Sequence, residues 1–223
     1  MHTAYPLMLD IVDRPILIVG GGSVAARKAR GLLDAGATKI RVVSPAFCGE
    51  IPAAVQRIGA CYNVEHLEGA ALVFAATDSA EVNSRVVRDC RDRGIWVNRA
   101  DSHDADHGDF STPAVLRKGL VTVTISTAGA PMLARAVRDG IADRFDPQWS
   151  AMAEAMQSLR PMILNATQLS PEARRSALRD LLTPAAFAAL ADGVESLTEW
   201  LRKRYPQITG ATVIVLPDNL YRA

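Results

Sequence analysis

A short apolar run that leads straight into a glycine-rich turn constrains this chain more than any other feature. The run is Ile16–Val19, the turn is Gly20–Gly22, and a helix-compatible segment from Val24 to Ala35 follows. Glycines let a ligand phosphate approach the backbone closely, and the first turn of a helix presents unpaired N–H groups and a positive dipole end. The order of strand, tight turn and helix, with G-x-G-x-x-A spacing, therefore predicts a dinucleotide-binding unit.

Further apolar runs alternate with helical patterns as far as residue 100. The runs Ile40–Pro45, Leu72–Ala76 and Ile95–Asn98 predict strands. Ser79–Arg93 predicts a helix, and a weaker pattern around Tyr62–Val64 predicts a short strand. Continuous apolar strands that alternate with helices indicate a parallel sheet covered on both faces. We therefore predict an α/β protein with a Rossmann-like dinucleotide-binding domain over residues 1–110.

The pattern changes in the segment 111–147. Apolar and hydroxylic residues alternate along Val121–Ser126, which predicts a strand with one buried face, and Ala130–Phe145 predicts a helix with a proline in its first turn. The segment holds too few apolar residues for a large core of its own. We therefore expect a small α+β dimerisation segment that pairs with a second copy of the chain.

Residues 148–223 predict a C-terminal helical domain. A Ser-Pro pair at 170–171 and a Thr-Pro pair at 183–184 combine an N-cap with a first-turn proline, so each pair predicts a helix start. Apolar positions between 187 and 201 repeat at helical spacing and predict one continuous helix. An apolar run at 212–216 predicts a late strand.

Composition narrows the classes of function. The 223 residues carry 25 basic and 24 acidic side chains, a formal net charge of +1, which gives no general affinity for nucleic acid. No apolar run approaches the roughly 20 residues of a membrane span, and the N-terminus lacks a signal-peptide pattern. The three cysteines have no CxxC spacing, which is typical of a reducing cytoplasm. We expect a cytoplasmic protein without nucleic-acid or membrane partners.

Several segments between residues 5 and 145 carry a family resemblance. They are Tyr5–Leu9, Gly20–Lys28, Val43–Pro45, Ala75–Asp78, Asn83, Val97–Asp101, Phe110 with Pro113 and Ala114, and Ile125–Arg135. In this order they resemble the precorrin-2 dehydrogenases, which also form the N-terminal half of siroheme synthases. The resemblance implies NAD-dependent oxidation of precorrin-2 to sirohydrochlorin, in siroheme or cobalamin-related synthesis, by a homodimer.

Two alternatives to this function stay open. Some members of the family also insert ferrous iron, so the chain is either a dehydrogenase alone or a bifunctional dehydrogenase and sirohydrochlorin ferrochelatase. An alternative of another class is a non-catalytic, dinucleotide-sensing regulatory module. A sensor needs neither a carboxylate at Asp101 nor the motif Ile125–Arg135, and both are present.

Asp101 is the candidate catalytic residue. It follows the strand predicted at Ile95–Asn98, at the edge of a parallel sheet where ligands bind, and the resemblance aligns it with the family's catalytic aspartate. A carboxylate there can accept a proton or orient the macrocycle, although an aspartate after a strand also caps loops. The resemblance places Ser126 at the tetrapyrrole site. Cations that suit a substrate rich in carboxylates are Arg135, which we favour, and Arg27, Lys28, Arg117, Lys118 and Arg138.

The expected cofactor contacts lie in three turns. They are Gly20, Gly21, Gly22, Ser23 and Val24 in the glycine turn, Ser44, Pro45 and Ala46 after the second strand, and Thr77 and Asp78 after the third. Ser44 occupies the place where a Rossmann protein usually has an acidic residue for the ribose hydroxyls. The resemblance implies NAD, whereas the residues alone leave NADP open because Lys39 and Arg41 are near in sequence.

The segment between Asp101 and Phe110 departs from the family pattern. It is slightly longer, and Gly108 stands where the family has a cysteine. It includes side chains of the types that bind divalent metals, namely His103, Asp104, Asp106, His107 and Asp109. Close spacing alone does not bring ligands to one point, so we expect a solvated polar loop and no metal site. The insertion leaves open whether iron insertion is gained or lost.

Overall fold

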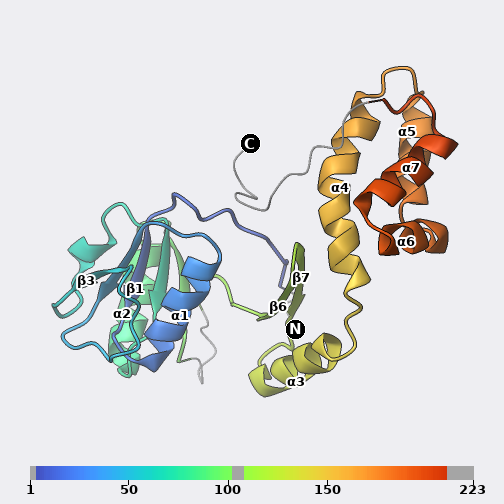
Figure 1. The fold of residues 1–223 in the computed structure, drawn as a ribbon. Helices are drawn as coiled ribbons and strands as arrows, with labels where there is room; N and C mark the ends of the chain where they lie inside the picture. The colour runs from blue at the N-terminus through green and yellow to red at the C-terminus, as the bar shows by residue number, and fades with distance from the viewer. Residues whose placement is uncertain (1–3, 102–107, 210–223) are drawn as a thin grey trace. The chain divides into compact units, whose positions relative to one another are not determined.

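The structure is a computed structural model that describes residues 4–101 and 108–209 (Figure 1). The chain divides into two compact units, Met1–Thr112 and Pro113–Ala223, and each is described by itself. The strand predicted at 212–216 and residues 102–107 of the insertion lie outside the described residues. Within the described ranges, every helix is too short or too polar to cross a membrane.

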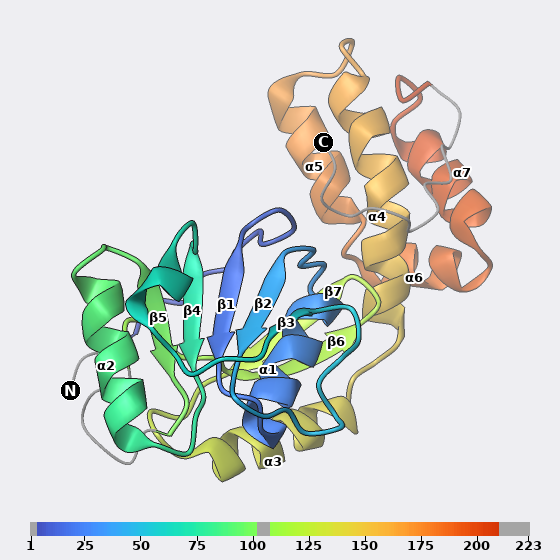
Figure 2. The ribbon, with the colours of Figure 1, turned by 90° about the vertical axis from the view of Figure 1, so that its left-hand side faces the viewer.

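The first unit is built on a five-stranded parallel sheet in the order β3-β2-β1-β4-β5 (Figure 2). The strands are β1 (Ile16–Val19), β2 (Ile40–Val43), β3 (Gln56–Ile58), β4 (Leu72–Ala75) and β5 (Trp96–Arg99). The helices are α1 (Ser23–Asp34), the short 3₁₀ helix η1 (Val64–Leu67) and α2 (Ala80–Arg91). The predicted α/β class with a Rossmann-like parallel sheet is confirmed.

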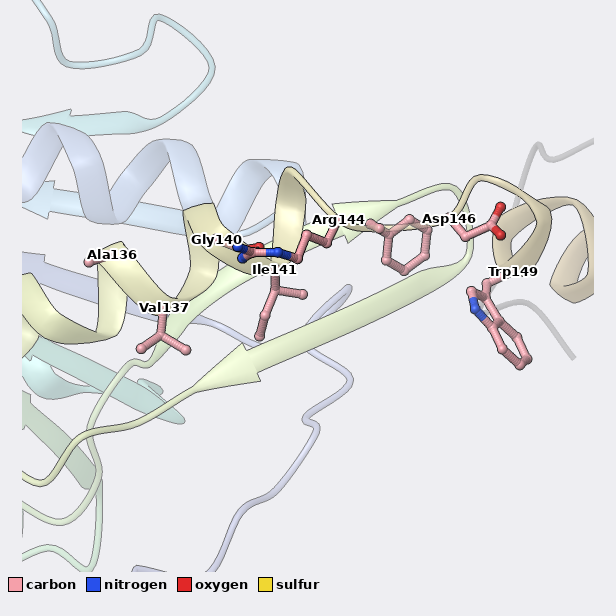
Figure 3. A pocket seen from close by; sticks show the side chains of 8 residues that line it. Ala136, Val137, Gly140, Ile141, Arg144, Asp146 and Trp149 are labelled. Atoms are coloured by element: carbon pink, nitrogen blue, oxygen red, sulfur yellow. The ribbon is translucent and has the colours of Figure 1, made fainter.

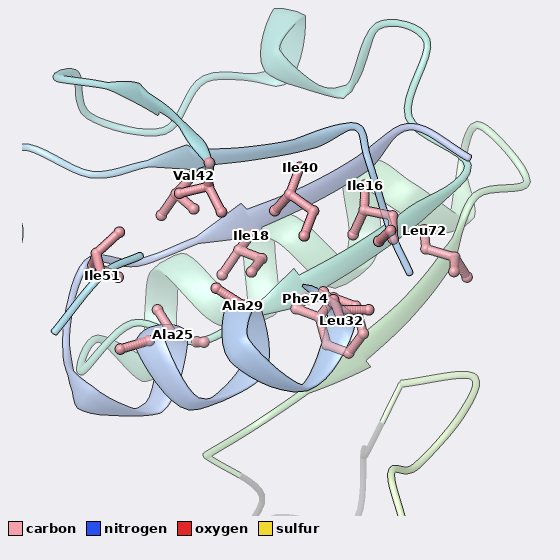
Figure 4. Close-up of a cluster of buried hydrophobic side chains, with 14 of the residues drawn as sticks. Ile16, Ile18, Ala25, Ala29, Leu32, Ile40, Val42, Ile51, Leu72 and Phe74 are labelled. Atoms are coloured by element: carbon pink, nitrogen blue, oxygen red, sulfur yellow. The ribbon is translucent and has the colours of Figure 1, made fainter. Parts of the chain in front are cut away.

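The central strand β1 is buried on both faces. Its alternate residues point to opposite sides of the sheet, so Ile16 and Ile18 pack into the cluster that contains α1 (Figure 4), and Leu17 and Val19 pack into the cluster that contains α2. This double burial explains why the strand reads as a continuous apolar run. It also fixes the glycine turn that follows β1 at the carboxyl edge of the sheet.

One strand of the first unit differs from the prediction. One edge strand of the sheet is β3 at Gln56–Ile58. The strand predicted around Tyr62–Val64 is wrong, because the residues from Val64 form η1 instead. The side chain of Asn63 accepts a hydrogen bond from the backbone N–H of Glu65 at 3.0 Å. This cap favours a helical turn at that point over an extended strand.

The second unit begins with a two-stranded hairpin and a helix. Strand β6 (Ala114–Lys118) pairs antiparallel with β7 (Val121–Ile125), and α3 (Pro131–Ala142) follows. Strand β7 was predicted and β6 was missed, because the exposed charged residues at the end of β6 interrupt the alternation of apolar and polar residues that marks a strand. Gly119 has a φ of 53°, and this left-handed conformation turns the chain between the two strands. The predicted helix at 130–145 is present but shorter.

Four helices complete the second unit and share one apolar core. They are α4 (Gln148–Asn165), α5 (Pro171–Asp180), α6 (Pro184–Ala191) and α7 (Val194–Arg204). Both predicted Pro starts are confirmed, but the single helix predicted across 187–201 is wrong. Gly193 has a φ of 109°, which ends α6 and separates it from α7. The division of this unit at residue 147 stays a prediction.

Candidate active site

The glycine turn after β1 is held tightly by its neighbours. A Cβ atom at Gly20, whose φ is 123°, would lie 2.3 Å from the backbone oxygen of Ala76. A Cβ at Gly21 would lie 2.0 Å from the backbone oxygen of Ala46 and 2.7 Å from Oγ of Ser44. Side chains at these two positions would therefore push the turn away from the segments that follow β2 and β4.

Gly22 differs from the other two glycines because it faces open space. A Cβ at Gly22 would meet no described atom within 4 Å, and no hydrogen bond from a described side chain caps the first turn of α1. The first N–H groups of α1, at Ser23 and Val24, therefore have no side-chain cap among the described residues, and both Gly22 and Ser23 are exposed. This is the arrangement that a pyrophosphate requires, so the glycine turn fits a dinucleotide cofactor.

The segment after β2 offers neutral groups to a cofactor. Ser44 is buried and its Oγ accepts a hydrogen bond from the N–H of Ala46 at 3.4 Å, whereas Pro45 and Ala46 are exposed. The cations that kept NADP open lie elsewhere. Nζ of Lys39 lies 3.8 Å from Oδ1 of Asp13, and Arg41 donates to the carbonyl oxygens of residues 66 and 68.

The turn after β4 is rigid because Asn83 pairs with it. The Asn83 side chain is fully buried, accepts hydrogen bonds from N–H and Oγ1 of Thr77 at 3.1 and 2.8 Å, and donates to the carbonyl oxygen of Thr77 at 3.0 Å. The predicted contact Thr77 therefore uses its side chain within the turn, while Asp78 is exposed. Asn83 belongs to the segments that carry the family resemblance, but no role was predicted for it from the sequence.

Asp101 lies just after β5 and forms a two-point ion pair with Arg99. Nε of Arg99 donates to Oδ1 of Asp101 at 2.7 Å, and Nη2 donates to Oδ2 at 3.3 Å. Burial by itself raises the pKa of Asp101, but hydrogen bonds from Arg99 and Asn83 and the charge of Arg99 outweigh it, so the pKa lies below its ordinary value. Asp101 is therefore an ionised, oriented carboxylate at neutral pH.

The chain returns from the insertion along β5. Gly108 has a φ of 77°, and a Cβ there would lie 2.3 Å from the carbonyl oxygen of Val97, so this close approach requires glycine. Oδ2 of Asp109 accepts from the N–H of Val97 at 3.0 Å, and its Oδ1 lies 3.5 Å from Nε of Arg91. Asp109 therefore anchors the chain, and among the described residues no cluster of metal-ligating side chains is present.

The remaining predicted residues divide between the two units. In the first unit, Nζ of Lys28 donates to Oγ1 of Thr112 at 2.5 Å and lies 5.5 Å from the centre of the Phe74 ring. In the second unit, Ser126 follows β7 and Arg135 lies on α3, and both are exposed. Their exposure leaves both side chains accessible to a ligand.

Comparisons with known proteins agree with this geometry. Residues 7–114 match a family described as "Putative NAD(P)-binding". The chain is 37% identical to siroheme synthase 1 of Aeromonas salmonicida over 164 residues, which is 71% of this chain and 34% of that protein. It is 40% identical to the siroheme synthase of Photorhabdus laumondii over 140 residues, which is 60% of this chain and 29% of that protein. The chain thus spans about a third of the length of these curated relatives.

A solved structure covers more of the chain. The structure described as "SirC, precorrin-2 dehydrogenase" superposes with a TM-score of 0.72 at 25% identity, over 90% of this chain and all of that one. The first unit is therefore a nicotinamide-dinucleotide-binding fold. Together with the siroheme synthase relatives, these matches support a likeness of the chain to the family of precorrin-2 dehydrogenases and siroheme synthase N-terminal domains.

Proposed function

We propose that this protein oxidises precorrin-2 to sirohydrochlorin with NAD. The observation that carries the proposal is that an open glycine turn and an ionised aspartate share one edge of a parallel sheet. The turn at Gly22 follows β1 and Asp101 follows β5, and both strands end at the carboxyl edge. Open α/β sheets bind their ligands at this edge.

The chemistry of the reaction gives Asp101 its role. Bound NAD would accept a hydride from precorrin-2. Loss of the hydride leaves positive charge on the macrocycle, and loss of a proton then gives sirohydrochlorin, so the balance is one NADH and one proton released. An ionised carboxylate fixed nearby stabilises that developing charge. Oδ2 of Asp101, which has the longer bond to Arg99, is the atom that would take the proton and pass it to water.

NAD rather than NADP is the cofactor that the segment after β2 favours. A 2′-phosphate needs a cation, but the Lys39 ammonium pairs with Asp13 and the Arg41 guanidinium donates to the carbonyl oxygens of residues 66 and 68. The exposed residues Pro45 and Ala46 carry no charge. The ribose hydroxyls would meet the neutral group of Ser44 and the backbone beside it.

A homodimer is the assembly that the second unit favours. Helix α3 exposes Met132, Leu133 and Val137, with exposed fractions of 81%, 56% and 40%. Beside it lies a groove of about 730 Å³ that extends from Ala136 to Trp149 (Figure 3). A contiguous apolar surface of this kind is typical of a protein–protein interface. A second copy of the chain would cover it, and Ser126 and Arg135 near it would bind substrate carboxylates.

The test uses purified protein, precorrin-2 and NAD. We expect the absorption spectrum of sirohydrochlorin to appear together with NADH, and an unchanged spectrum in the presence of bound NAD would identify a sensor instead. Ferrous iron added afterwards distinguishes a dehydrogenase from a bifunctional dehydrogenase and ferrochelatase. Only the bifunctional enzyme would convert sirohydrochlorin to siroheme faster than the protein-free control. The cytoplasmic location stays a prediction.

A further inference from the structure

Arg99 is a buried arginine in a strand, where the loss of hydration of its charge costs free energy. It is the last residue of β5, and its side chain is only 5% exposed. A guanidinium is stable in such a place only when acceptors surround it. Arg99 lies within the sequence motif Val97–Asp101, which assigns it no role.

The partners of Arg99 lie on two elements. On α2, Nη1 donates to Oγ of Ser84 at 3.1 Å and Nη2 approaches the carbonyl oxygen of Ala80 at 3.4 Å. On the other side, the guanidinium donates to both carboxylate oxygens of Asp101. The arginine therefore connects the first turns of α2 to the candidate catalytic carboxylate.

This two-point contact fixes more than charge. Two parallel N–H···O bonds set the plane of a carboxylate as well as its position, and Arg99 is itself fixed because Ser84 and Ala80 hold its other N–H groups. The Asp101 side chain remains 24% exposed. One part of the carboxylate is thus held by the protein while another part faces outward.

We propose that Arg99 is a positioning residue for precorrin-2 oxidation, holding the Asp101 carboxylate in a fixed orientation at the edge where cofactor and substrate meet. This inference rests on the proposed function. Among the described residues, Arg99 is the charged group that acts on Asp101, and α2 adds the neutral amide of Asn83. Lysine cannot replace the arginine fully, because an ammonium group lacks the planar fork.

The experiment compares Arg99→Met and Arg99→Lys with the wild type in the precorrin-2 assay. We expect Arg99→Met to lower kcat about ten- to hundredfold, as for the loss of charged hydrogen bonds that orient a reacting group, with KM for NAD within about twofold. Arg99→Lys should recover part of the loss. The acid limb of the kcat profile should move to higher pH in Arg99→Met, because Asp101 loses the partner that lowers its pKa.

A matched control is Arg85→Met, which removes the ion pair between Arg85 and Asp89 on the same helix α2. It should keep wild-type kcat and the same acid limb. If Arg99→Met and Arg99→Lys both keep wild-type kcat, the positioning role is wrong. If the wild type itself forms no sirohydrochlorin, the proposed function is wrong, so the two failures are distinguishable.

A measurement on the wild-type protein covers the case in which both Arg99 variants fail to fold or to bind NAD. Carboxyl ¹³C NMR, with Asp101→Asn for assignment, reports the titration of Asp101 directly. A midpoint below the ordinary aspartate value of about 3.9 supports the Arg99 contact in solution. An ordinary midpoint would overturn the proposal, because the carboxylate would then not be held by Arg99.

Discussion

Asn83 forms three hydrogen bonds with Thr77 and so joins helix α2 to the turn that follows β4. Because the Asn83 amide is fully buried, its removal leaves both the N–H and the carbonyl oxygen of Thr77 without these partners. Asn83→Ala should therefore lower the free energy of unfolding by about 2 kcal/mol or more. It should also weaken NAD binding, since the cofactor turn loses its support.

Urea denaturation and NAD titration test this prediction. The control is Ser84→Ala, at the next position of α2, which loses hydrogen bonds to Ala80 and Arg99 but none to Thr77. NAD affinity should fall in Asn83→Ala and stay near wild type in Ser84→Ala. Equal NAD affinities in the two variants would contradict the assigned support.

Gly22 gives a prediction about the cofactor that is separate from stability. Gly22→Val places a branched side chain in open space beside the first turn of α1, so it should fill the pyrophosphate space and weaken NAD binding at least about tenfold. Thermal unfolding without cofactor should change little. Gly21→Ala, in contrast, should lower the temperature of thermal unfolding, because its Cβ would lie 2.0 Å from a backbone oxygen. Unchanged NAD affinity in Gly22→Val would refute the cofactor placement.

Asp101→Ala should abolish turnover while NAD binding persists. The carboxylate lies at the end of β5, whereas the predicted pyrophosphate contacts belong to the turn after β1. The substitution also leaves Arg99 buried without its anionic partner, so some loss of stability is expected. Asp101→Asn, which keeps an acceptor for Arg99, should lose activity with less loss of stability. A parallel loss of NAD affinity and activity in both variants would contradict the catalytic role.

Lys28 makes stability depend on pH in the alkaline range. Burial, with a smaller contribution from the charge of Arg27, lowers its pKa from 10.5 to about 8. Between these two values the unfolded chain binds more protons than the folded chain, so stability should rise with pH there. Lys28→Met should lack this rise. Denaturation at several pH values from about 7 to about 10 measures the difference between the two proteins, and identical slopes would show that Lys28 titrates normally.

Helix α3 carries the prediction about assembly. Leu133→Asp places a charge on the exposed apolar face of α3, away from the buried residue Ala134. If a second copy covers this face, the variant should be a monomer in light scattering while the wild type is a dimer. An exposed position on another helix, Leu164→Asp, is the control and should leave the mass unchanged. A monomeric wild type would reject the proposed dimer.

Local sequence patterns predicted most of the first unit and two helix starts of the second. The run Ile16–Val19, the glycines after it and the helix starts at Pro171 and Pro184 depend on contacts within a few residues, so the sequence reports them directly. The candidate position Gly22 followed from the same logic, because a ligand site lies where parallel strands end. Asp101 lies at that edge too, but its predicted catalytic role came from the family resemblance. Errors occurred where a local signal was weak, as at β6, or where one glycine decided the result, as at Gly193.

Periodicity and the turn chemistry of glycine were sufficient to predict the alternation of strands and helices and the sheet edge proposed to bind ligands. How the candidate residues are held became visible only in the folded protein. Arg99 pairs with Asp101 and also with α2, and Asn83 pairs with Thr77 across the end of a strand. These contacts depend on which side chains folding buries together and on the low dielectric around them. A short stretch of sequence contains neither kind of information, because the partners come from distant parts of the chain.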